Sequence, residues 1–271
     1  MSRRWNEKTI VITGGSRGLG LAIAKAFASK SAKVVLLGRN QADLDLAEQE
    51  VSRMPNAFQV ETHAFDITDE SSFENHFSRL VESLGCIDVW VNCAGKSIRC
   101  NLVASTIEQY RELMEINFFA ATRCALSALP YLQESGGHLI NIGSLASKTA
   151  WPYVAPYSTS KHALAALTGQ LRLEGPSEVH YLHVCTGPIA RQDDSDRYRE
   201  QSAQLDEKAR QAGAGAPVRK IDPDDLAERI VRACEQRSPE LVLPGRSRLL
   251  FALSQLSPRW GDRLLRRLAR K

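Results

Sequence analysis

Short apolar runs alternate with longer amphipathic segments along most of the chain. The first run, T-I-V-I-T at residues 9–13, is β-branched and shows no polar alternation, which is typical of a strand buried on both faces of a parallel sheet. Similar runs predict five further strands, at residues 34–37, 58–64, 88–91, 138–142 and 179–185. The other periodic segments predict helices at residues 19–30, 44–54, 70–84, 106–132, 155–174 and 222–236.

This regular alternation of strands and helices predicts the fold class. It favours an α/β fold with a single doubly wound parallel sheet of Rossmann type, right-handed crossovers and helices on both faces. No repeat, low-complexity segment or linker divides the body of the chain. We therefore expect one domain over residues 1–245, followed by a C-terminal tail over residues 246–271.

Composition agrees with a soluble globular protein and excludes several classes. Of 271 residues, 43% are hydrophobic and 24% are charged, and no apolar run approaches the ~20 residues of a membrane span. The N-terminal M-S-R-R-W-N-E-K is not followed by a signal-peptide pattern, and the six cysteines form no C-x-x-C pair or disulfide framework. These features predict a cytoplasmic protein with free thiols. We expect no nucleic-acid partner.

Positive charge is concentrated in the tail. It carries eight Lys and Arg residues against one acid, a net charge of +7, so the other 245 residues together carry −3 of the total of +4. Pro258 is expected to break or bend a helix there. Apolar side chains precede and follow this proline: Leu249, Leu250, Phe251, Leu253 and Leu256, then Trp260, Leu264, Leu265 and Leu268. A basic amphipathic helix of this kind either contacts an anionic membrane surface peripherally or packs against its own domain or a second subunit.

A glycine-rich stretch, T-G-G-S-R-G-L-G at residues 13–20, joins the first strand to the first helix. Glycines at this turn allow the backbone to approach a pyrophosphate, which also meets the helix N-terminus. The spacing of Gly14, Gly18 and Gly20 is G-x-x-x-G-x-G and not the common G-x-G-x-x-G. A connection that binds nothing is the alternative, but the position at the first strand–helix turn favours a nucleotide site.

Two arginines bear on the choice of nucleotide. Arg39 follows the second strand, where dinucleotide sites usually carry an acid for the adenosine ribose. An arginine there suits a 2′-phosphate, and Arg17 of the glycine loop could reach the same group. The alternative is that both arginines face solvent and bind no phosphate. The pattern favours NADP over NAD.

Tyr157 and Lys161 form a pair with four-residue spacing on the predicted helix 155–174. This spacing brings side chains together on a helix, and a neighbouring ammonium favours the charged form of a phenol. A surface pair without chemistry is the alternative, and the pair alone does not decide between them.

The motifs occur in an order that resembles the single-domain branch of the short-chain dehydrogenase/reductase superfamily, over roughly residues 8–245. The ordered set is T-G-x-x-x-G-x-G, Asp66-Ile67, N-C-A-G at residues 92–95, Asn117, Ser144, Y-x-x-x-K and T-G-P-I at residues 186–189. The resemblance implies hydride transfer between a nicotinamide and a carbonyl or alcohol carbon. A weaker resemblance, to 11β-hydroxysteroid-dehydrogenase-like and 3-ketosphinganine-reductase-like members, implies an apolar or lipid-like substrate.

The resemblance also implies a role for each catalytic residue. Tyr157 would be the acid that protonates the carbonyl oxygen, and the base in the reverse direction. Lys161 would favour its phenolate and hold the nicotinamide ribose, and Ser144 would donate a hydrogen bond to the same oxygen. Asn117 would hold a helix distortion and a water that relays protons, and Asp66 would bind the adenine amino group.

The implied cofactor site draws on most of the motifs. Its residues are Gly14, Ser16, Arg17, Gly18, Leu19, Gly20, Arg39, Asp66, Ile67, Asn92, Ala94, Gly95, Tyr157, Lys161, Gly187, Pro188 and Ile189. Two positions depart from the family pattern: Cys93 stands where a second Asn is common, and Thr186 where a Pro is common. Because of these two departures, the resemblance does not predict the geometry of the loops that contain them.

Substrate contacts are expected from Ser144, Tyr157, Trp151 and Tyr153, although the last two could equally be packing residues. Residues 191–217 form either a lid or a surface loop, and Asp193, Asp194 and Asp196 do not form a metal site because the mechanism needs none. We expect a small-molecule substrate and a homodimer or homotetramer. A non-catalytic NADP-binding sensor or scaffold is the alternative, and an epimerase or dehydratase is less favoured because no larger C-terminal substrate domain follows.

Overall fold

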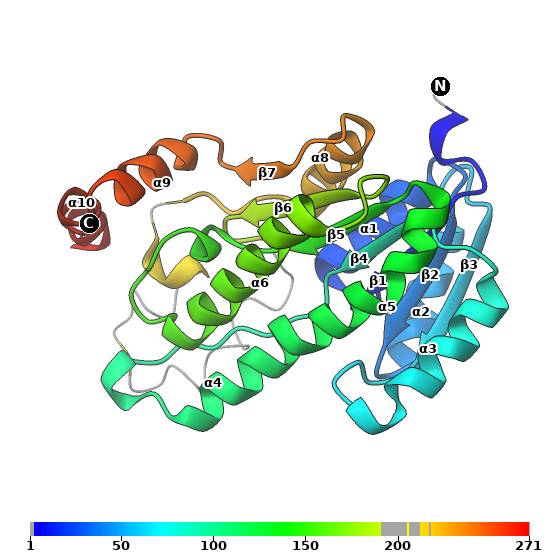
Figure 1. Cartoon of the computed structure of the whole chain (residues 1–271), viewed down its shortest axis with the longest axis horizontal. Helices are drawn as coiled ribbons and strands as arrows, with labels where there is room; N and C mark the ends of the chain where they lie inside the picture. Colours follow the sequence, from blue (N-terminus) through cyan, green and yellow to red (C-terminus); the bar gives the residue numbers. More distant parts are fainter. Residues whose placement is uncertain (1–2, 191–204, 206–211, 217, 271) are drawn as a thin grey trace.

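Seven parallel strands form the central sheet of the protein, in the order β3-β2-β1-β4-β5-β6-β7 (Figure 1). The computed structural model describes residues 3–190, 205, 212–216 and 218–270. The strands are β1 (Thr9–Thr13), β2 (Lys33–Gly38), β3 (Gln59–Ala64), β4 (Val89–Asn92), β5 (His138–Ile142), β6 (His180–Thr186) and β7 (Glu240–Leu243). The predicted doubly wound α/β fold is confirmed.

Helices cover both faces of this sheet and enclose two hydrophobic cores. One face carries α1 (Gly18–Ala28), α2 (Gln41–Ser52) and α8 (Pro223–Glu235), and the other carries α3 (Glu70–Leu84), α5 (Ala120–Ser135) and α6 (Ala155–Glu174). Within β2, Val34 and Leu36 join the first core, whereas Val35 and Leu37 join the second. Strands that supply both cores have no polar face, which explains their continuous apolar sequence.

The predicted helix 106–132 is divided in the structure. It comprises α4 (Ile107–Met114), the π-helical segment η3 (Glu115–Phe119) and α5. Pro130 lies inside α5 without ending it, and the helix stops at Gly136, whose φ of 61° is left-handed. The apolar periodicity alone cannot reveal a single π turn, because the helix continues on both sides of it.

The sequence analysis missed the last strand, β7. It contains only four residues, E-L-V-L, and stands between Pro239 and Pro244, so it has too few positions for a recognisable pattern. It pairs in parallel with the end of β6 and begins the path to the tail. The short 3₁₀ turns are η1 (Arg3–Trp5), η2 (Leu102–Ala104), η4 (Leu145–Ser147) and η5 (Ala212–Gly215).

Two helices make up the tail, α9 (Ser247–Leu256) and α10 (Pro258–Arg270), with the C-terminus far from the N-terminus (Figure 1). Ser257 between them is extended and Pro258 begins α10, so the proline interrupts the helix as predicted. Phe251 is buried against Cys185 and Val242, which joins α9 to the end of the sheet. In the described part of the chain, no helix is long and apolar enough to cross a bilayer.

Candidate active site

A large cleft opens at the carboxyl ends of the strands. Its volume of about 2590 Å³ exceeds the ~300–1,000 Å³ of an ordinary small-ligand pocket, so it has room for a dinucleotide and a second molecule. Open parallel sheets bind ligands at this edge. Most of the predicted site residues line it: Gly14, Ser16, Arg17, Gly18, Leu19, Gly20, Arg39, Asp66, Ile67, Ala94, Gly95, Ser144, Trp151, Tyr157, Lys161, Gly187, Pro188 and Ile189.

The glycine loop after β1 is shaped for close backbone approach. Gly14 has a φ of 68°, and a Cβ there would lie 2.9 Å from the Ala94 Cα; a Cβ on Gly20 would lie 2.2 Å from the Gly14 carbonyl oxygen. The N-terminus of α1 that follows has no side-chain cap and no acid in its first turn. Such a helix end attracts an anion, so these residues fit the pyrophosphate of a dinucleotide.

Thr13 links the glycine loop to the loop after β4, a function that the sequence analysis did not assign. Its buried hydroxyl accepts hydrogen bonds from the backbone N–H groups of Cys93 (3.0 Å) and Ala94 (3.1 Å). It donates to the carbonyl oxygen of Val91 at 3.2 Å. One side chain therefore fixes both loops; its only sequence signal is its place immediately before the first glycine.

Arg39 and Asp66 lie together in the cleft. Arg39 Nη1 is 3.8 Å from Asp66 Oδ2, while Asp66 Oδ1 accepts hydrogen bonds from Thr68 N (2.9 Å) and Thr68 Oγ1 (2.7 Å). The Arg39 side chain is 74% exposed, and an ion pair this exposed contributes about 0–1 kcal/mol. Arg39 can therefore turn toward a phosphate at little cost.

Ser144 and Tyr157 face the cleft from two neighbouring elements. Ser144 follows β5, and its Oγ accepts a hydrogen bond from Ala146 N (3.1 Å), which leaves its own proton to donate. Its backbone N–H donates to Ser147 Oγ at 2.9 Å, which holds the turn. Tyr157 lies in the first turn of α6, and both residues line the cleft.

Lys161 lies one turn after Tyr157 and is buried beneath the cleft. Its Nζ donates a hydrogen bond to the carbonyl oxygen of Ile142 at 2.8 Å, at the end of β5. Burial lowers the pKa of this ammonium from 10.5 to about 8, and the nearby Cys93 opposes the shift. The group therefore carries its positive charge at pH 7 but holds it weakly.

Asn117 connects the π segment to the loop after β4 and to α6. Its Nδ2 donates to the Lys96 carbonyl oxygen (2.9 Å) and to Ser160 Oγ (3.0 Å), and its Oδ1 accepts from Lys96 N (2.9 Å). Gly95 is enclosed by this arrangement. A Cβ there would lie 2.7 Å from Asn117 Oδ1 and 3.6 Å from Lys161 Nζ, so a side chain at this position would displace the Asn117 amide.

Three predicted site residues do not line the cleft: Asn92, Asn117 and Tyr153. Asn92 is buried, and its Nδ2 donates to Asn141 Oδ1 (2.8 Å) and to the Ala121 carbonyl oxygen (3.0 Å). Tyr153 has a left-handed φ of 65°, and its carbonyl oxygen accepts from Cys100 N at 3.0 Å. Asn92 therefore joins β4 to β5 and α5, whereas Asn117 and Tyr153 hold the chain around Lys96 and Cys100.

Trp151, an expected substrate contact, lines the cleft and donates its indole N–H to the Ala214 carbonyl oxygen at 3.0 Å. The cleft is also lined by tail residues that the sequence analysis did not place there: Leu250 and Phe251 of α9 and Leu268 of α10. Most of the predicted lid, with Asp193, Asp194 and Asp196, lies outside the described residues.

Comparison with known proteins identifies the family. Residues 8–202 match the family model for short chain dehydrogenases. The chain belongs to the short-chain dehydrogenase/reductase family. It is 29% identical over 245 residues to dehydrogenase/reductase SDR family member 7B of Danio rerio, which covers 88% of this chain and 78% of that protein. An uncharacterized oxidoreductase of Staphylococcus epidermidis is 31% identical over 169 residues, covering 62% and 71%.

Solved structures of short-chain dehydrogenases share the fold. L-sorbose reductase from Gluconobacter frateurii, complexed with NADPH and L-sorbose, superposes with a TM-score of 0.75 at 26% identity, covering 89% of this chain and 95% of that one. NAD⁺-bound xylitol dehydrogenase superposes with a TM-score of 0.78 at 21% identity, covering 88% and 98%. The second likeness concerns the fold alone.

Proposed function

We propose that this oxidoreductase interconverts a carbonyl and a secondary alcohol with NADP(H). The observation that supports the proposal most directly is the convergence of Ser144 and Tyr157 on the same cleft as the glycine loop, with the Lys161 ammonium buried one helical turn below. A protein that binds the cofactor without catalysing a reaction would need the glycine loop, but it would not need Ser144, Tyr157 and Lys161 together in the cleft.

The side chains act on the charge that develops during reduction. The nicotinamide supplies the hydride when it is bound, and negative charge then forms on the carbonyl oxygen. Tyr157 donates its phenolic proton to that oxygen, and Ser144 donates a hydrogen bond to it. Lys161, charged below a pKa of about 8, stabilises the phenolate that remains. Asn117 acts by positioning the loop and the helix that carry these groups.

The choice of NADP rests on this chain and not on its relatives, whose structures hold NADPH in one case and NAD⁺ in another. Arg17 and Arg39 both line the cleft, and the residue directly after β2, near which the adenosine ribose would lie, is Arg39 and not an acid. Two guanidinium groups suit a 2′-phosphate and gain nothing from a 2′-hydroxyl.

An apolar, lipid-like substrate is supported by the tail. Leu250, Phe251 and Leu268 add apolar surface to the cleft that Trp151 also lines. A second apolar stripe of the tail faces outward: Leu249 is 69% exposed, Leu256 83% and Trp260 67%. The surrounding arginines suit an anionic membrane, so we propose that the tail contacts a membrane surface peripherally.

We also propose that copies of the chain assemble into a homodimer or homotetramer. Support comes from large apolar side chains exposed along the α4–α5 helical run: Ile107 (57%), Phe119 (50%) and Leu126 (54%). Apolar side chains on one surface favour burial against a partner. Light scattering after gel filtration should give a mass of two or four chains; a single chain would contradict the proposal.

The test of the activity is NADPH consumption with a panel of ketones and aldehydes of increasing apolar length. We expect turnover that rises with apolar length and falls ~10²-fold or more in Tyr157→Phe, which removes the transferable proton but keeps the ring. NADPH binding, followed by fluorescence, should persist in the variant. Tight NADPH binding with no turnover of any carbonyl would instead support the sensor or scaffold.

A further inference from the structure

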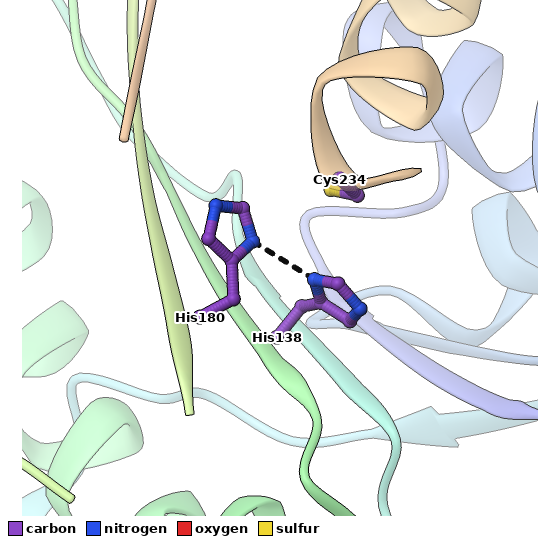
Figure 2. A group of neighbouring side chains, drawn as sticks. All are labelled: His138, His180 and Cys234. Atoms are coloured by element: carbon purple, nitrogen blue, oxygen red, sulfur yellow. Dashed lines mark hydrogen bonds between the residues drawn. The ribbon is translucent and has the colours of Figure 1, made fainter. Parts of the chain in front are cut away.

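Two histidines and a cysteine meet in the core (Figure 2). They lie at the amino ends of β5 and β6, whereas the cleft opens at the carboxyl ends of the strands. His138 and His180 are the first residues of β5 and β6 and are register partners, so their side chains lie side by side on one face. Cys234 reaches them from the last turn of α8. All three are buried, and their ligand atoms lie within 4.8 Å of one another.

The hydrogen bonds of this group determine which nitrogen atoms carry protons. His180 Nε2 lies 2.8 Å from the carbonyl oxygen of Ser238, which can only accept, so Nε2 carries the proton of the neutral ring. Its Nδ1 therefore carries a lone pair and accepts a hydrogen bond from His138 Nδ1 at 2.8 Å. In metal-binding histidines, the ring nitrogen that does not bind the metal usually donates its N–H to a carboxylate, a backbone carbonyl or a water. His180 already has this arrangement.

Both imidazoles are neutral at physiological pH. Burial, with a contribution from the neighbouring His180, lowers the pKa of His138 to about 3, and burial also lowers that of His180. Burial raises the pKa of the Cys234 thiol, so a thiolate forms only where a cation takes the place of the proton. The group therefore offers two neutral nitrogen ligands and one latent thiolate.

We propose that His138, His180 and Cys234 form a three-coordinate site for a thiophilic d¹⁰ ion, with Cu⁺ preferred over Zn²⁺. Thiolate and imidazole ligands select these ions, and two histidines with one cysteine make a trigonal set. Zn²⁺ in structural sites almost always takes four ligands, and this group supplies three. Binding needs the two Nδ1 atoms, now 2.8 Å apart, to separate by roughly 0.7 Å, since two nitrogen atoms ~2.0 Å from one trigonal ion lie ~3.5 Å apart.

Charge balance favours the monovalent ion. Binding of one Cu⁺ forms one Cu–S and two Cu–N bonds, releases the thiol proton to solvent, and moves the His138 proton from Nδ1 to Nε2. Neither copper nor sulfur changes oxidation state. The product is neutral, whereas Zn²⁺ would leave one positive charge in an apolar core, which is costly when it is unpaired. The nearby Arg4 and Arg237 repel that charge, although Glu235 offsets part of the effect.

The location points to a structural role. The Trp5 ring packs on His138 with 5.4 Å between centroids, and Trp5 Nε1 donates to Glu235 Oε1 at 2.9 Å. An ion at this point would join η1, two central strands and the end of α8. None of the three ligands lines the cleft, so we expect activity to be independent of the ion.

The experiment is anaerobic Cu⁺ titration of the full chain against a chromogenic Cu⁺ chelator. Iodoacetamide first blocks the accessible thiols, exposed Cys86 and cleft-lining Cys93. Cys234→Ala is compared with Cys124→Ala, which removes an equally buried thiol from the other core. We expect one equivalent bound in the wild type and in Cys124→Ala, and binding weaker by more than about 100-fold in Cys234→Ala, since even loss of an outer partner costs ~10–100-fold.

Two further measurements keep the proposal testable if Cys234→Ala folds poorly. X-ray absorption of the copper-loaded wild type should show one sulfur and two nitrogen neighbours, and Cu⁺ should raise its melting temperature. Equal binding by Cys234→Ala and the wild type, a first shell without that composition, or tighter binding of Zn²⁺ than of Cu⁺ would each overturn the proposal. The histidines would then be a hydrogen-bonded core pair only.

Discussion

Replacing Lys161 with methionine should abolish activity and make the protein more stable. The Lys161 side chain is 6% exposed, and burial lowers its pKa from 10.5 to about 8. Each pKa unit corresponds to about 1.4 kcal/mol, so burying this charged ammonium lowers the free energy of unfolding at pH 7 by roughly 3 kcal/mol. Methionine has a similar length and no charge, but it loses the hydrogen bond to the Ile142 carbonyl oxygen, which costs about 1 kcal/mol. The expected gain at pH 7 is therefore about 2 kcal/mol.

The pH dependence separates this explanation from a general packing effect. The folded-state pKa of Lys161 lies below its unfolded value, so between pH 8 and 10.5 the unfolded chain binds more protons than the folded one. Wild-type stability therefore gains from this group as pH rises through that window, and the penalty is fully present below pH 8. The methionine variant lacks the effect. Its advantage over the wild type should shrink by roughly 3 kcal/mol from pH 7 to pH 10.5.

The assay is urea unfolding of the cofactor-free protein at a series of pH values, with wild type and variant compared at each. Other groups titrate equally in both chains and cancel in the difference. At pH 7 the melting temperature should rise by about 4–8 °C. The control is Lys30→Met, which removes an accessible ion pair with Glu228 and should change stability by no more than about 1 kcal/mol. A variant no more stable than the wild type, with a difference that does not change with pH, would refute the reasoning.

Four other changes test the cofactor site and the tail. Arg39→Asp should weaken NADPH binding and improve relative use of NADH, because an acid repels a 2′-phosphate; a wild type that already prefers NADH in titrations would contradict this. Gly95→Ala should lower kcat/KM at least ~10-fold by displacing Asn117 and Lys161, and unchanged kinetics would show that the loop yields. Thr13→Val should weaken NADPH binding measurably, because two backbone N–H groups lose their acceptor. The full chain should sediment with anionic liposomes and a chain ending at Gly245 should not, while neither chain should sediment with neutral liposomes; failure of the full chain to sediment with anionic liposomes would contradict the membrane proposal and leave packing as the role of the tail.

Much of the fold could be predicted because it depends on the periodicity of apolar residues and on the order of the strands and helices along the chain. Six strands, their helices and the glycine turn follow from apolar runs and from the place of Gly14 after the first strand. The spacing of Tyr157 and Lys161 locates both on one helix, and the structure places them in consecutive turns of α6. These features are local, so a single sequence carries them.

The features that the sequence analysis missed depend on tertiary contacts. The four residues of β7 become a strand only because β6 offers an edge for pairing. The Asn92 side-chain amide donates hydrogen bonds to Asn141 and to the Ala121 carbonyl oxygen, which are distant in the sequence. The N-C-A-G motif suggests that Asn92 contacts the cofactor, but its side chain points to these partners instead. The approach of His138 to Cys234 spans 96 residues and depends on how α8 packs on the sheet.

The structure shows that the two hypotheses for the tail are compatible. Phe251 is buried against the end of the sheet, and Leu250 beside it lines the cleft, so one face of α9 is occupied by the protein itself. Leu249, Leu253 and Leu256 recur at i, i+4 and i+7 on the outer face, where they are 69%, 40% and 83% exposed. Packing therefore accounts for one face and leaves an apolar stripe on the other. Because the same short helix borders the cleft and carries this stripe, a lipid surface that binds the stripe would lie next to the cleft, and an apolar substrate of the kind proposed above would pass between them without crossing water.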